Sequence, residues 1–352
     1  MSSVLVENIN TELKHHAGLK RLDVLSKRGR NFLGTRYAIM GGAMSWLSER
    51  NLVSAISNAG GFGVIACGGM SPKQLGYEID ATSAMTDKPF GVNLITIHPD
   101  LDDLIEVCGE KKVSHVVLAG GLPSGASIAK IKAFEAKVIC FSPALVLAKK
   151  LVRSGVDALV IEGAEAGGHI GPVSTAVLAQ EILPHIREVP IFVAGGIGRG
   201  EAIASFLEMG AAGCQLGTRF VCATESVAHS NFKKAFIRGS ARDAMPTVQI
   251  DPRFPVIPVR ALKNDGSEKF MIFQRKMVNK FQEGEIELYD AQMDIERFWV
   301  GALKKAVIDG DVENGSVMAG QSVGMVKSEQ PTHYIIQELV DQAAEFLEQK
   351  FG

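Results

Sequence analysis

Between Arg36 and Phe220 the chain repeats one pattern of hydrophobic and polar positions. A short apolar or β-branched run is followed by a Gly-rich or polar break, and then by a longer stretch whose apolar residues recur with helical spacing. Eight short runs predict β-strands: Tyr37–Met40, Gly63–Ala66, Phe90–Leu94, His115–Leu118, Lys137–Phe141, Ala158–Glu162, Ile191–Ala194 and Cys214–Gly217.

Strands that alternate with helices must pair in parallel, because each helix carries the chain back to the starting edge of the sheet. Near-continuous apolar strands, such as VVLA and IFVA, are typical of a parallel sheet covered on both faces. The unusual residues of these units follow the strands directly, and such positions converge on one face of a closed barrel. An open sheet would place GxGxxG after its first strand, and that spacing is absent here. We therefore expect an α/β fold, a (β/α)8 TIM barrel with a smaller, mainly helical inserted lid domain.

The alternating pattern ends after Thr224, which divides the chain into four parts. Residues 1–225 are expected to form the barrel with an N-terminal extension. Residues 226–300 contain prolines and no strand-helix alternation, so we interpret them as a helical insertion or lid. Residues 301–326 are Gly-rich and apolar again and should return to the barrel, and residues 327–352 should contain a C-terminal amphipathic helix.

Composition narrows the range of partners. The chain has 352 residues, 46% hydrophobic and 22% charged, with a net charge of -2, so it offers no electrostatic case for binding nucleic acid or an anionic membrane. No apolar run approaches the 18 residues that a membrane helix needs, and the N-terminus lacks a signal-peptide pattern. We expect a cytoplasmic protein with a small-molecule substrate, and a homodimer is left open beside a monomer.

The five cysteines form no CxxC pair, and their odd number argues against a disulfide framework. No histidine stands at metal-ligand spacing from Cys, Asp or Glu, so no catalytic metal is expected. Serine-hydrolase chemistry lacks its GxSxG elbow.

Two glycine-rich turns predict a phosphate site. The strand IFVA ends in Ala194-Gly195-Gly196 ahead of a helix, and the next strand ends in Gly217 and Thr218. Glycines let backbone N–H groups point at an anion, and turns after the seventh and eighth strands hold phosphorylated ligands in many barrels. The alternative is that these glycines only serve tight strand-helix turns.

A second group of residues could handle protons beside a flat ligand. In EGAEAGGHIG, Gly167 and Gly168 permit close backbone approach, and His169 is the side chain suited to proton exchange near neutral pH. Glu162 and Asn93 end apolar strands and could bond the polar edge of a ring. The alternatives are a structural histidine, a Glu162 that only orients backbone amides, and an Asn93 that only caps the following loop.

Six segments in this order resemble the nitronate monooxygenase (2-nitropropane dioxygenase) family: IMGGAMSW, NAGGFGVI, KPFGVNL, EGAEAGGHIG, VAGGIGRG and QLGTRFVCATES. The resemblance implies a flavin mononucleotide (FMN) enzyme on a (β/α)8 barrel. It also implies that Gly41, Gly42 and Ala43 line the flavin ring, that Asn93 bonds it, and that Glu162 and Gly167 flank it. Gly195 and Gly196 would hold the phosphate end together with Gln215, Leu216, Gly217 and Thr218, and His169 matches the family's base.

The sequence also resembles a second branch, the flavin-dependent enoyl-acyl carrier protein reductases. VRALKN (259–264) and GDVENGSVMAGQ (310–321) carry this likeness, and Glu162 stands where many nitronate oxidisers are expected to have Gln or Asp.

Three functions follow from these patterns. Oxidation of an alkyl nitronate with O2, giving a carbonyl compound and nitrite, comes first, because it needs only flavin, one base and an apolar pocket. NAD(P)H-dependent reduction of an enoyl thioester is the alternative, with NAD(P)H as a second cofactor. A phosphate-binding barrel without flavin is the third, because a barrel alone does not fix a function.

Overall fold

The computed structural model describes residues 3–251, 254 and 256–351, with side chains from residue 17 to residue 350. Eight parallel strands form the central sheet in the order β1-β9-β8-β6-β5-β4-β3-β2. Their bounds are β1 Ile39–Gly41, β2 Gly63–Ala66, β3 Phe90–Ile95, β4 His115–Ala119, β5 Lys137–Phe141, β6 Ala158–Glu162, β8 Ile191–Ala194 and β9 Gly213–Leu216.

The sheet closes between its first and last strands. Met40 bridges Phe62 in parallel, the N–H of Gly41 donates to the carbonyl of Phe62, and the N–H of Phe62 donates to the carbonyl of Ile39. The predicted (β/α)8 TIM barrel is therefore confirmed. The predicted strand limits differ most at β1 and β9, because Tyr37 donates to the Gly60 carbonyl outside the ladder and Gly217 already caps a helix.

Helices cover the outside of the barrel, where every second strand residue packs against them. These helices are α2 Arg50–Asn58, α3 Pro72–Met85, α4 Leu101–Glu110, α5 Gly125–Ala133, α6 Leu145–Arg153, α7 Thr175–Ile182, α8 Gly200–Glu208 and the short α9 Thr218–Val221.

The other strand residues fill the barrel interior and form a separate apolar cluster that includes Met40, Val117, Val160 and Phe192. The N-terminal helix α1 (Ser3–Leu33) closes the bottom of this cluster with Phe32 and Leu33. His115, at the start of β4, contacts this end of α1: its Nε2 lies 3.0 Å from the Phe32 carbonyl oxygen. Burial lowers the pKa of this imidazole, which indicates a neutral, structural histidine.

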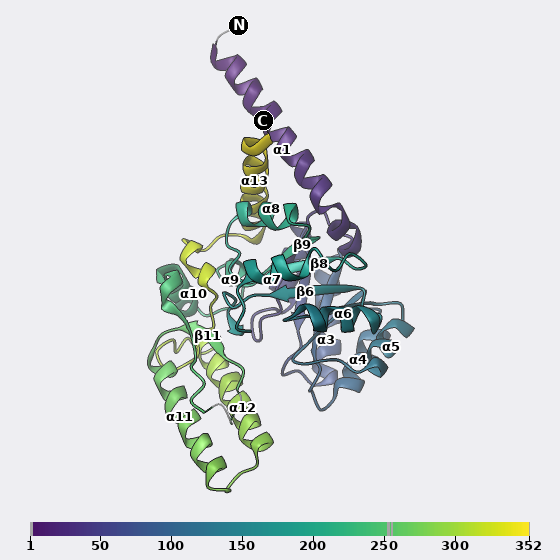
Figure 1. Cartoon of the computed structure of the whole chain (residues 1–352). Helices are drawn as coiled ribbons and strands as arrows, with labels where there is room; N and C mark the ends of the chain where they lie inside the picture. The colour runs from purple at the N-terminus through teal and green to yellow at the C-terminus, as the bar shows by residue number, and fades with distance from the viewer. Residues whose placement is uncertain (1–2, 252–253, 255, 352) are drawn as a thin grey trace.

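The chain after α9 builds a second lobe beside the barrel, and its elements are α10 Ser230–Arg238, η1 Ala241–Asp243, β10 Ala244–Pro246, β11 Val259–Leu262, α11 Asp265–Gln282, α12 Leu288–Val307 and η2 Gln321–Met325. In Figure 1, α11 and α12 form a helical hairpin that projects from the barrel, whereas α1 and the C-terminal helix α13 (Thr332–Phe351) lie at the opposite end. The division expected at residue 300 falls inside α12, so one helix joins the two segments that the sequence suggested.

A short strand in the loop after β6 joins this lobe to the barrel. β7 (Gly168–His169) pairs antiparallel with β11, which pairs in turn with β10. The sequence pattern placed His169 at the end of a loop; it lies instead on β7, whose partner Val259 is about 90 residues away and leaves no local signal. Residues 226–300 are mainly helical, as expected, with the short strands β10 and β11 in addition.

Candidate functional site

Three polar side chains lie on the inner face of the barrel at the carboxyl ends of its strands. Ala158 and Val160 belong to the interior cluster, so Glu162, two residues further on, points to the same side. The same alternation places Asn93 in β3 and Gln215 in β9 at the mouth, where both are buried. Asn93 Nδ2 donates to the Val117 carbonyl at 3.0 Å, which leaves its amide oxygen directed at no partner among the described residues.

Among the carboxyl groups at the barrel mouth, Glu162 has the pKa that departs furthest from its ordinary value. It is half-buried and makes no hydrogen bond or ion pair within the described chain, and burial raises its pKa to about 7. A carboxyl group in a concave site with a pKa near neutrality is a common property of functional sites.

The predicted phosphate end has the required backbone. Gly195 and Gly196 have φ values of +96° and +72°, a region that favours glycine, and follow β8 directly. Their N–H groups and that of Gly217 are half-buried and donate to no partner in the described parts of the chain. Unpaired half-buried N–H groups are rare in proteins, so an anion that accepts from them fits this site. Thr218 lies beside them, and its Oγ1 accepts from the Gly320 N–H at 3.1 Å.

The end of β1 approaches β9 closely at this mouth. The Gly42 N–H donates to the Leu216 carbonyl at 2.8 Å, and a Cβ atom on Gly42 would lie 3.6 Å from the Gly217 Cα and 3.7 Å from the Gln215 amide nitrogen. Gly41 continues the ladder opposite Leu216, and Ala43 packs on the interior cluster. The Leu216 side chain faces the outer helices, so only its backbone reaches the mouth.

The glycine pair after β6 contacts the segment that returns from the second lobe. A Cβ atom on Gly167 would lie 2.5 Å from the Gly320 nitrogen, and the Gln321 N–H donates to the Glu165 carbonyl at 2.9 Å. Gly168 has a φ of +78° at the start of β7. These contacts bring residues 318–321 to the edge of the barrel mouth.

His169 faces the second lobe. Its Nε2 lies 3.1 Å from Glu296 Oε2 and 3.3 Å from Oε1, and the two side chains are 39% and 33% exposed. A carboxylate can only accept a hydrogen bond, so in this pair Nε2 carries the hydrogen and Nδ1 is left to exchange protons with a ligand.

Three positioning residues have no distinctive sequence signal. Glu296 lies on α12, 127 residues from its partner. Arg260, on β11, is buried and donates from Nε to the Ala164 carbonyl at 2.9 Å and from Nη1 to the Ala244 carbonyl at 2.5 Å, which joins the barrel loop to β10. The Glu165 carboxylate accepts from the Thr175 N–H at 2.9 Å and so ties this loop to α7. Glu165 and Arg260 fall in segments that carry a family resemblance, EGAEAGGHIG and VRALKN, whereas Glu296 falls in none.

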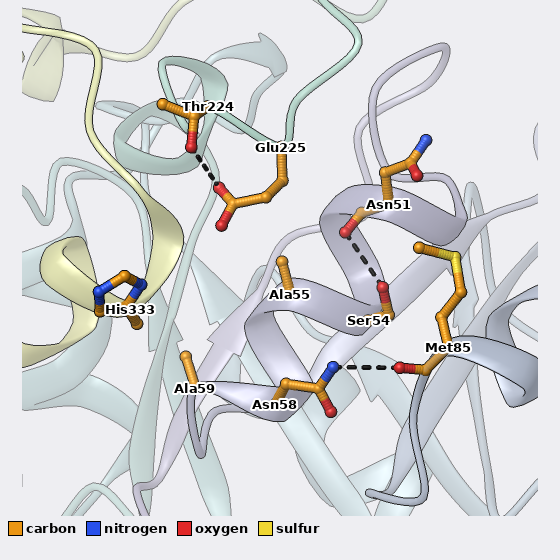
Figure 2. A pocket seen from close by; sticks show the side chains of 9 residues that line it. All are labelled: Asn51, Ser54, Ala55, Asn58, Ala59, Met85, Thr224, Glu225 and His333. Atoms are coloured by element: carbon orange, nitrogen blue, oxygen red, sulfur yellow. Dashed lines mark hydrogen bonds between the residues drawn. The ribbon is translucent and has the colours of Figure 1, made fainter.

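A hollow of about 610 Å³ lies on the outer surface, away from the barrel mouth. Figure 2 shows this hollow: Ala55 and Ala59 of α2 lie on the side of Glu225 and His333, whereas Ser54 and Asn58 lie on the side of Met85. Its polar groups serve the fold: Asn58 donates to the Met85 carbonyl, and the Glu225 carboxylate accepts from the Thr332 N–H.

Within the described residues, no helix is long and apolar enough to span a bilayer, and no group of three or more His, Cys, Asp or Glu side chains has metal-binding geometry. All five cysteines are buried free thiols, and burial raises the pKa of each: Cys67, Cys108, Cys140, Cys214 and Cys222.

Comparisons with known proteins agree with this geometry. FabK from Thermotoga maritima superposes with a TM-score of 0.82 at 35% sequence identity, over 92% of this chain and 97% of that structure. A Mycobacterium tuberculosis protein named (3aS,4S,5R,7aS)-5-hydroxy-7a-methyl-1-oxo-octahydro-1H-indene-4-carboxyl-CoA dehydrogenase is 28% identical, over 88% of this chain and 93% of its own length. A probable nitronate monooxygenase of Staphylococcus saprophyticus is 26% identical, over 92% of this chain and 99% of its own.

The family description for nitronate monooxygenase matches residues 27–112 and 101–342, which include every strand of the barrel and most of the second lobe. This confirms the resemblance drawn from the six sequence segments. The chain therefore belongs to the nitronate monooxygenase family of oxidoreductases.

Proposed function

We propose that this protein is an FMN-dependent oxidoreductase that reduces the α,β double bond of an enoyl thioester with NAD(P)H. The observation that carries the choice of substrate is the likeness, over 88% of the chain, to the relative named as an octahydro-1H-indene-4-carboxyl-CoA dehydrogenase, whose named substrate is a CoA thioester. The segments 259–264 and 310–321, which resemble the enoyl reductases, also supply β11 and the contact at Gly320 that border the candidate site.

The residues of the barrel mouth fit FMN. The unpaired N–H groups of Gly195, Gly196 and Gly217 suit a phosphate, and the inward polar groups of Glu162 and Asn93 suit the polar edges of the ring and its side chain. When bound, FMN supplies hydride and electron transfer, which none of the side chains at this site can perform.

His169 supplies or removes the proton in this proposal. In thioester reduction the α-carbon gains a proton. Nδ1 of the imidazole, held at Nε2 by Glu296, takes up a proton from solvent and then delivers it. Arg260 and the pairing of β7 with β11 hold this histidine at a fixed place relative to the barrel loop.

Nitronate oxidation is the second candidate, and the family match supports it. It needs the same flavin and the same histidine, which would take an α-proton from a neutral nitroalkane or stabilise the nitronate anion. It does not need the reductant NAD(P)H.

Anaerobic mixing of the flavin-loaded enzyme with one reactant at a time separates the two. We expect NADH or NADPH to bleach the flavin absorption, and octenoyl thioester to restore it. Bleaching by propyl-nitronate, with no response to either nicotinamide cofactor, would favour nitronate oxidation instead. A purified protein that is colourless and takes up no FMN would contradict both.

The pair between His169 and Glu296 predicts a specific loss of turnover. Glu296→Gln can present either an amide oxygen or an NH2 group to Nε2, so it no longer fixes the tautomer of the imidazole, and turnover should fall by about 10- to 100-fold with little change in KM. Steady-state kinetics measure this, and Asp294→Asn on the same helix, where Asp294 pairs with Arg297, is the matched control. Equal turnover of both variants would show that Glu296 does not position His169.

A further inference from the structure

The second lobe contains a cavity that the proposed reaction leaves unexplained. It has a volume of about 180 Å³ and lies between the three-stranded sheet and the helices α11 and α12. Its apolar lining comes from Met245, Val248, Val259, Ala261, Met271 and Trp299. Val259 and Trp299 are buried, whereas Met245 and Val248 are 53% and 64% exposed and form the rim.

The cavity shares a face of the sheet with His169. Alternate residues of a strand point to the same side, and Val259, Ala261 and Lys263 all line the cavity, whereas Arg260 turns toward the barrel loop. Val259 is the cross-strand partner of His169, and directly opposed residues point to the same face. Ala261 lies two positions beyond Val259 along the strand, so the cavity reaches about 7 Å beyond the level of His169.

On the opposite wall of the cavity, the residues of helix α12 follow the same order, with the contact to His169 first and the cavity lining after it. Glu296 contacts His169, and Trp299, one turn further along the helix, lines the cavity. A molecule that places its reacting carbon beside Nδ1 of His169 can therefore extend between the sheet and α12 into the cavity.

The apolar lining favours a hydrocarbon group on the ligand. A dry cavity of about 150 Å³ holds a molecule the size of benzene, so this one accommodates a short hydrocarbon chain or one ring. Ser316 belongs to the lining, and its buried hydroxyl has no hydrogen-bond partner among the described residues, so a hydrocarbon group beside it breaks no existing hydrogen bond. A small nitronate would leave most of this space empty.

We infer that this cavity binds the distal hydrocarbon end of the substrate's acyl chain while the thioester end lies beside His169. The inference rests on the proposed thioester reaction. It adds a substrate preference, for acyl chains long enough to pass from His169 to Trp299. Crotonyl thioester reaches only the histidine, whereas octenoyl thioester also fills the cavity.

Methyl NMR of the flavin-loaded enzyme tests occupancy without turnover. Two of the twelve methionines, Met245 and Met271, line the cavity, and their ¹³C-methyl resonances can be assigned from Met→Leu variants. The probe is octanoyl-N-acetylcysteamine, a saturated thioester that cannot be reduced. We expect saturable shifts at both methyls and at least tenfold weaker binding in Ala261→Leu, whereas Ser316→Ala, which removes a hydroxyl that a hydrocarbon chain cannot bond, should bind the probe at least as tightly as wild type.

Ser322→Ala is the matched control, because Ser322 is also buried but does not line the cavity. If Ala261→Leu fails to fold, the wild-type enzyme still tests the inference, because kcat/KM should rise at least tenfold from crotonyl to octenoyl thioester. Probe binding without shifts at Met245 and Met271, or equal kcat/KM for the two chain lengths, would overturn the inference. Saturable shifts in an enzyme that reduces no enoyl thioester would instead overturn the proposed reaction and support the cavity as a site for apolar acyl groups.

Discussion

Replacing His169 with alanine is expected to lower turnover by about 10²- to 10⁴-fold, which is the usual contribution of a positioned proton-transfer group. Flavin should remain bound, because His169 lies on β7, whereas the expected phosphate contacts come from the turns after β8 and β9. Absorption spectra of the purified variant measure flavin content, and steady-state rates measure turnover.

Two measurements distinguish lost proton transfer from lost structure in this variant. His185→Ala, an exposed histidine near the end of α7, should keep wild-type turnover. Added imidazole should partly restore His169→Ala, because the side chain is 39% exposed and leaves a site open to solvent. A His169→Ala enzyme with wild-type turnover would make this histidine a structural partner of Glu296.

Glu162→Gln is expected to stabilise the flavin-free protein, and only at neutral and alkaline pH. Burial raises the pKa of Glu162 to about 7, above its ordinary value of 4.5, so the folded state holds a proton that the unfolded state releases between these two values. The favourable contribution of the protonated carboxyl is complete below pH 4.5 and is lost as the pH rises through about 7. Above pH 7 the ionised carboxyl lowers the free energy of unfolding of the wild-type protein by up to about 3 kcal/mol, since each unit of pKa shift corresponds to about 1.4 kcal/mol.

Urea unfolding of the flavin-free protein measures this difference. The free energy of unfolding of Glu162→Gln should exceed that of wild type by up to about 3 kcal/mol at about pH 8 and match it at about pH 4.5. Glu181→Gln, an exposed carboxyl on α7, is the control and should follow wild type at both values. A constant difference between Glu162→Gln and wild type at all pH values would show that the carboxyl is not titrating in the barrel mouth.

The local pattern of the chain predicted the barrel because each of its units carries its own signal. An apolar strand, a glycine-rich or polar break and a helix repeat eight times, and parallel pairing of such strands leaves few alternatives. The same local pattern placed Asn93 and Glu162 at strand ends, whereas Gln215 was expected only from the family resemblance. Alternation along a strand then determines that all three side chains face inward.

The partners of His169 could not be predicted in this way. β7 is two residues long, and its pairing with β11 depends on the fold of a lobe encoded about 90 residues later. Glu296 is one of several acidic residues on an amphipathic helix, and nothing in its spacing distinguishes it from Asp294 or Asp290.

The sequence by itself determined the barrel, its glycine-rich turns and the position of one histidine after the sixth strand, because these features depend on residues close together in the chain. Only the tertiary structure decided that His169 sits on a strand that pairs with the second lobe, lies against Glu296 and shares a face of the sheet with residues that line an apolar cavity. Those contacts join segments far apart in sequence, and their free energy comes from packing that no local pattern specifies.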